Sequence, residues 1–187
     1  MRVSLGHLLP ALLLCAPQIA HAAADQPGDY WMVHHQGGAN THEIIVVDGD
    51  PAHMPARANG AVSLTVHRLY EGVDKPVMTT YETDVDCAGK RIRLQKASDL
   101  EWDMKTSKPV SVSSSWQTAP EAWLAKARDF ACQPATRSGM GMTPLGRMHV
   151  FGMIDNVNGR FRVLQREQSW APVLKMIDDA FDRMPQN

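Results

Sequence analysis

The chain has 187 residues, of which 44% are hydrophobic and 21% are charged, and its formal net charge is −1. This composition is typical of a globular protein with a hydrophobic core. The near-neutral balance excludes the strongly basic surface that nucleic-acid-binding proteins present, so we expect neither nucleic acid nor an anionic membrane surface as a partner.

Residues 1–22 have the features of a secretory signal peptide, with a positive charge at Arg2, an apolar run over 8–19 and small residues before the expected cleavage site. The run contains two prolines and is shorter than the about 20 residues of a membrane-spanning helix. We expect cleavage before Ala23 or Asp25 and no transmembrane helix afterwards. The protein is therefore expected to be exported, either to the periplasm or to the outside of the cell as a secreted or surface protein.

Cleavage would remove Cys15, which follows two leucines instead of the small residues that precede a lipid-attachment cysteine. The other two cysteines, Cys87 and Cys132, are 45 positions apart, so they form no CxxC redox pair, and neither has a histidine or cysteine at metal-ligand spacing. Two cysteines in an oxidising compartment normally pair. We expect a structural Cys87–Cys132 disulfide.

After the leader, roughly 165 residues remain, enough for one domain with an elaboration. Alternating apolar and polar residues, separated by turn signals, predict mostly antiparallel β structure. Strands are expected at 30–35, 41–48, 61–69, 77–87, 91–95 and 109–116. In 77–87, Glu82, Asp84 and Asp86 share one face and are expected to point towards solvent.

A helix is predicted over 119–131, where Thr118 and Glu121 have the spacing of a capping box and Pro120 lies in the first turn. Its apolar face should pack on the sheet and bring Cys132 to the turn that contains Cys87. That face consists of Trp123, Leu124, Ala127, Phe130 and Ala131.

The C-terminal extension, residues 136–187, is predicted as ββα and should pack on the same domain. Strands at 147–155 and 160–167 would flank an Asn158–Gly159 hairpin turn, and Ser169 would cap a helix over 169–184. The apolar stripe of this helix comprises Trp170, Val173, Leu174, Ile177, Phe181 and Met184. We expect this stripe to pack on the protein's own sheet, with a partner protein or dimer mate as the alternative.

Five segments within residues 30–132 together resemble the bacterial surface-adhesin protein E-like family. They are YWMV, VVD, YETDVDCAGKRIR, SSSW and FAC. The resemblance implies that residues 23–135 form a domain with an antiparallel sheet, a helix packed on it and a Cys87–Cys132 bond. It also implies that the protein is a soluble or surface-exposed protein of the cell envelope. We therefore predict an α+β fold, and a binding protein whose partner is a protein or an envelope or host-surface ligand. The resemblance assigns no binding residues.

Catalytic motifs are not evident. The chain has no G-x-S-x-G or P-loop pattern, and HEIIV begins like the zinc-protease motif H-E-x-x-H but has Val46 in place of the second histidine. We expect no catalysis and no cofactor, and we keep a secreted hydrolase as a remote alternative.

Two groups of potential metal ligands are the other candidate site, because thioether and imidazole groups suit copper in an exported protein. The groups are His34, His35 and His42, and Met140, Met142, Met148 and His149. We expect these residues to be structural or solvated rather than ligands, with a periplasmic copper-binding or haem-binding protein as the alternative.

Overall fold

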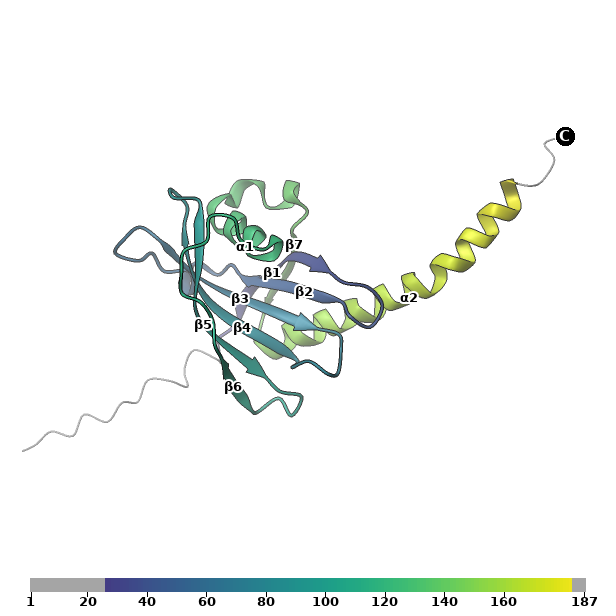
Figure 1. Cartoon of the computed structure of the whole chain (residues 1–187), viewed down its shortest axis with the longest axis horizontal. Helices are drawn as coiled ribbons and strands as arrows, with labels where there is room; N and C mark the ends of the chain where they lie inside the picture. The colour runs from purple at the N-terminus through teal and green to yellow at the C-terminus, as the bar shows by residue number, and fades with distance from the viewer. Residues whose placement is uncertain (1–25, 183–187) are drawn as a thin grey trace, which may run out of the picture.

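The computed structural model describes residues 26–182, so the expected signal peptide, its cleavage site and Cys15 lie outside the described residues. Within this range the predicted α+β fold is confirmed: a seven-stranded antiparallel sheet carries two helices (Figure 1). The strand order is β6-β5-β4-β3-β2-β1-β7, and all pairs are antiparallel. The strands are β1 (Gly28–Gln36), β2 (Glu43–Asp48), β3 (Val62–Tyr70), β4 (Met78–Asp86), β5 (Arg91–Leu100), β6 (Ser107–Val110) and β7 (Thr143–Met148).

Both faces of the sheet are covered, as the composition of β2 shows. Ile44 to Val47 are all buried, because Ile45 and Val47 face the helix α1 (Ala122–Cys132) while Ile44 and Val46 face the helix α2 (Val150–Asp182). A continuous apolar run is what a strand buried on both faces requires. Three short 3-10 helices complete the fold: η1 (Pro51–His53), η2 (Pro134–Thr136) and η3 (Ser138–Met140).

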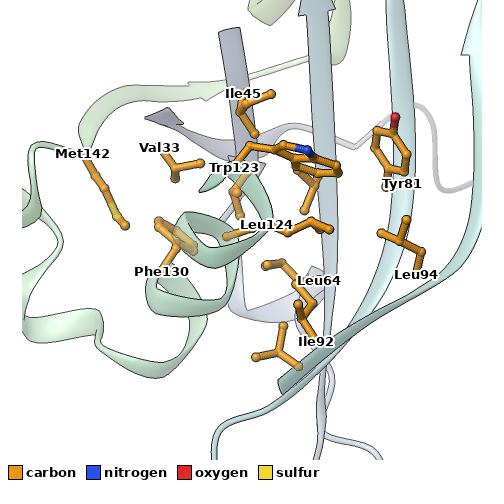
Figure 2. Close-up of a cluster of buried hydrophobic side chains, with 14 of the residues drawn as sticks. Val33, Ile45, Leu64, Tyr81, Ile92, Leu94, Trp123, Leu124, Phe130 and Met142 are labelled. Carbon is orange, nitrogen blue, oxygen red and sulfur yellow. The ribbon is translucent and has the colours of Figure 1, made fainter. Parts of the chain in front are cut away.

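The core under α1 is drawn in Figure 2. Four of the five residues predicted for the apolar face of this helix are buried, and Ala131 packs against the same core partly buried. The helix begins at 122 rather than 119 because Glu121 has an extended backbone. Its carboxylate accepts a hydrogen bond from Trp123 Nε1 at 2.8 Å, so the predicted capping box does not form.

The disulfide joins Cys87, at the turn between β4 and β5, to Cys132, at the end of α1. The two Cα atoms are 5.4 Å apart, within the usual range for a disulfide. The pairing predicted by counting cysteines is confirmed, and the bond fixes the helix to the β4–β5 hairpin.

The strand predicted at 109–116 is wrong for most of its length, since β6 ends at Val110. The following serines are exposed and have no neighbouring strand. Trp116 instead lies under the guanidinium groups of Arg91 and Arg93, at 4.8 and 4.5 Å from its ring centroid. These cation–π contacts hold the connection to α1 against β5.

The acidic face predicted for β4 is also corrected, because Asp84 is only 3% exposed. It accepts hydrogen bonds from Arg57, Arg93 and Gln95. Burial would raise the pKa of Asp84, but the hydrogen bonds from Arg93 and Gln95 outweigh it and lower the pKa. Glu82 is exposed as predicted, whereas Asp86 is partly buried beside Arg91.

The predicted β-hairpin of the extension is wrong. Residues 147–155 and 160–167 fall mainly in the single helix α2, with Asn158 and Gly159 inside it, and β7 begins before the first predicted strand. A helical spacing of apolar residues explains this result, because Met153, Ile154, Val157 and Phe161 form one buried face against the sheet. Burial of that face outweighs a local turn signal.

The predicted packing of the C-terminal stripe on the protein's own sheet is wrong as well. Ser169 does not begin a helix, since α2 is continuous from 150 to 182 and contains Pro172. Trp170, Leu174 and Ile177 are 55%, 56% and 45% exposed, on a part of α2 that projects away from the sheet (Figure 1). The side chain of Phe181 and all of Met184 lie outside the described part of the structure.

Among residues 26–182, no helix combines the length and the apolar character needed to cross a membrane.

Candidate binding site on the sheet face

One end of the sheet face that carries α1 is left open, and polar side chains gather there. They line a concavity of about 300 Å³, here called the sheet-face pocket. Its lining comprises Glu43, Arg68, Tyr70, Lys75, Pro76, Thr79, Tyr81, Asp99 and Val110. The volume lies at the lower end of the range for small-ligand sites.

Strand alternation and register bring these side chains together. Leu64 and Val66 of β3 point into the α1 core, so the next positions of that alternation, Arg68 and Tyr70, face the same side beyond the end of the helix. Arg68 lies opposite Thr79 in β4, and Thr79 lies opposite Asp99 in β5. The pocket is therefore a direct continuation of the core face in which polar residues replace apolar ones.

An ion pair stands at the centre of the pocket. Arg68 donates from Nε and Nη2 to the same carboxylate oxygen of Glu43, at 3.1 and 2.5 Å, and Gln36 donates to that oxygen at 2.6 Å. The guanidinium carbon lies 5.6 Å from the ring centroids of both Tyr70 and Trp123. Burial alone would lower the pKa of Arg68, but the hydrogen bonds that Arg68 donates to Glu43 and the nearby tyrosines outweigh it, and the pKa is raised. Arg68 is thus a fixed cation held between a carboxylate and two aromatic rings.

A chain of hydroxyl groups forms the second polar element. Thr79 Oγ1 donates to Asp99 at 2.6 Å and lies 3.0 Å from the hydroxyl of Tyr70. Because the single proton of Thr79 is used on Asp99, Tyr70 is the donor in the second bond. Burial raises the pKa of Tyr70 to about 12, so the phenol stays protonated. Tyr70 is therefore a hydrogen-bonding group and not a base.

These groups suit binding of a ligand rich in hydroxyl groups. Two of the five N–H bonds of Arg68 are used on Glu43, which leaves donors for a ligand. The carboxylates of Glu43 and Asp99 can accept from ligand hydroxyls, while Pro76 and Val110 offer apolar surface. Held in place by the sheet, these groups require little reordering when a ligand binds.

The histidines considered as alternative metal ligands are only partly brought together. His35 Nε2 lies 2.9 Å from His42 Nδ1, on the α2 side of the sheet, whereas His34 pairs with Gln36 at 3.3 Å. Burial, and then the neighbouring His42, lower the pKa of His35. Two imidazoles that are hydrogen-bonded to each other have these nitrogens occupied and do not present them to a metal ion.

The second group of candidate ligands is dispersed. Met142 is buried in the α1 core (Figure 2), and Met140 packs partly buried against it. Met148 packs in the α2 core, while His149 lies between β7 and α2 and accepts from Met153 through its backbone carbonyl. In the range 26–182, no three His, Cys, Asp or Glu side chains are grouped in a way that could hold a metal ion.

None of the residues central to the sheet-face pocket was identified from the sequence. The signal was present in β3, where the alternation that places Val66 in the core also places Arg68 and Tyr70 on the core face. Charged or phenolic residues at core-face positions near a strand end indicate that the covering layer stops there.

Comparisons with models of protein families, with curated proteins and with solved structures returned no match for this chain. The resemblance to the surface-adhesin protein E-like family therefore stays a prediction.

Proposed function

We propose that this chain is an exported, non-catalytic binding protein of the cell envelope and that it binds its ligand in the sheet-face pocket. The observation that carries the proposal is the preorganised Arg68–Glu43 ion pair, which lies beside Tyr70 at the uncovered end of the sheet face. The Cys87–Cys132 disulfide supports export, because such bonds persist in oxidising compartments.

The ligand class follows from the groups in the pocket. The pocket suits a sugar unit of an envelope or host-surface polymer. It offers hydrogen-bond acceptors, the remaining hydrogen-bond donors of Arg68 and a limited apolar surface. If the polymer belongs to a host surface, the protein acts as an adhesin, which agrees with the family resemblance.

The test is a glycan-array screen of the purified chain, followed by calorimetric titration of the best ligand. Arg68→Lys keeps the charge but removes the planar fork of donors, and it should weaken binding at least tenfold. Lys96→Met is the control, because Lys96 is highly exposed, pairs with the exposed Glu82 and does not line the sheet-face pocket. Equal affinities for the Arg68→Lys variant and the unaltered chain would exclude the pocket as the binding site.

A further inference from the structure

The distal half of α2, residues 165–182, is a helix without a surface of its own domain to pack on. The proximal half is held on the sheet by Met153, Ile154, Val157 and Phe161. The C-terminal part of the helix extends past the sheet (Figure 1). Only its first half is therefore stabilised by the core.

The exposed apolar residues of this helix form a stripe with a seven-residue repeat. Val163, Trp170 and Ile177 are 52%, 55% and 45% exposed, and Leu174 adds to the same side. Large apolar residues that recur every seven positions are the pattern by which two helices pack along each other. Trp170 is nine positions after Phe161, about half a circumference away at 3.6 residues per turn, so Trp170 lies on the side of the helix opposite the face that packs on the sheet.

The backbone of the distal half also requires external support. Helices in water depend mainly on tertiary packing of an apolar face. Pro172 lies inside α2 and has no N–H to donate to the carbonyl of Gln168. A projecting helix that contains a proline and exposes its apolar stripe is stable only when another surface covers that stripe.

The charged residues of α2 indicate which surface covers the stripe. The segment around the start of the stripe is basic, with Arg160, Arg162 and Arg166. The segment at its end is acidic on balance, because it contains Asp178, Asp179 and Asp182 against the single cation Lys175, which pairs with Asp179. Parallel pairing of two such helices would place like charges together, whereas antiparallel pairing places each basic segment beside an acidic one.

We propose that α2 pairs antiparallel with the α2 helix of a second copy of this chain. Trp170 then lies on the two-fold axis, and Val163 packs against Ile177 of the partner subunit. The stripe from Val163 to Ile177 covers about 21 Å at 1.5 Å per residue.

A groove on the protein's surface lies at the end of this stripe. It has a volume of about 280 Å³ and is lined by Met32, Ile44, Val163 and Leu164, among others. The antiparallel arrangement brings the end of the partner's α2 to this groove. The second copy thus meets complementary charges, the apolar stripe and a groove together.

Analytical ultracentrifugation of the purified chain tests the pairing. The chain should sediment as a dimer, and Trp170→Asp should raise the dimer dissociation constant at least about thirtyfold, because Trp170 meets itself at the centre of the interface. Val73→Asp is the control, because Val73 is 84% exposed, lies in the connection between β3 and β4 and is not part of the stripe. A monomer at all concentrations, or a dimer unaffected by Trp170→Asp, overturns the proposal.

Cross-linking tests whether the two α2 helices pair antiparallel or parallel. Chains with Val163→Cys, mixed with chains with Ile177→Cys, should form mixed disulfide dimers, whereas Val163→Cys chains alone should not. Self-cross-linking of Val163→Cys at equal rates would show parallel pairing and overturn the antiparallel arrangement. Co-sedimentation of a monomeric chain with neutral phospholipid vesicles, lost in Trp170→Asp, would assign the stripe to a membrane surface and also overturn the proposal.

Discussion

Acidification is expected to destabilise the fold through His67, a buried histidine in β3. The residue is 6% exposed, its Nδ1 lies 3.1 Å from Thr80 Oγ1, and its ring meets the edge of Tyr30 at 5.8 Å between centroids. Burial lowers the pKa of His67 from 6.5 to about 4, although the charge of Asp48 acts in the opposite direction. The folded protein therefore resists protonation of this ring.

The sign and size of the effect follow from proton linkage. Above pH 6.5, His67 is neutral in both the folded and the unfolded chain and contributes no pH dependence. Between pH 6.5 and 4 the unfolded chain binds a proton that the folded chain does not, so the free energy of unfolding falls as the pH falls. A difference of 2.5 pH units at 1.36 kcal/mol each corresponds to about 3 kcal/mol.

The assay is urea denaturation from pH 7.5 to 4, with the unaltered chain compared with His67→Gln. Glutamine retains a hydrogen-bonding group for Thr80 but does not titrate. Other ionisable groups act in both proteins, so the difference between the two curves isolates His67. The variant should lose about 3 kcal/mol less than the unaltered chain over this interval. Parallel curves would refute the reasoning.

Three further outcomes are expected. Cys87→Ser combined with Cys132→Ser should lower the free energy of unfolding by about 4 kcal/mol, measured by urea denaturation, since the bond closes a loop of 45 residues; an unchanged midpoint would contradict a stabilising role. Asp84→Asn should cost about 1 to 3 kcal/mol by the same measurement, while Glu82→Gln, on an exposed side chain, should change stability little. Mass analysis of the exported protein should show that residues 1–22 or 1–24 have been removed, whereas an intact N-terminus would contradict the signal-peptide prediction.

Strands β1 to β5 could be predicted because their sequences contain the apolar residues, alternating or continuous, that burial against the core imposes. Val62, Leu64 and Val66 are an example. The cysteine pairing could be predicted because the chain was expected to be exported to an oxidising compartment with two cysteines. The C-terminal extension could not be predicted in the same way. There, Asn158–Gly159 is a local signal, whereas the helix results from packing Val157 and Phe161 on a surface contributed by distant strands.

The sheet-face pocket was missed for a related reason. Arg68 and Tyr70 read as ordinary polar positions near the end of a strand, and their proximity to Asp99 depends on the register of three strands. Asp84 was misplaced because its hydrogen-bond donors come from other segments, namely Arg57 in a loop before β3 and Arg93 and Gln95 in β5. Such pairings are set by tertiary structure, so the amino-acid pattern of one strand does not reveal them.

The disulfide also has a consequence for resistance to proteases. Residues between Cys87 and Cys132 form a covalent ring, and the ring includes the exposed serines that follow β6. A protease that cuts at Ser113 or Ser114 would leave two fragments that remain linked through the cystine, with the sheet and α1 still docked. A nicked molecule would therefore migrate as one species until it is reduced, and it would retain the strands that form the pocket.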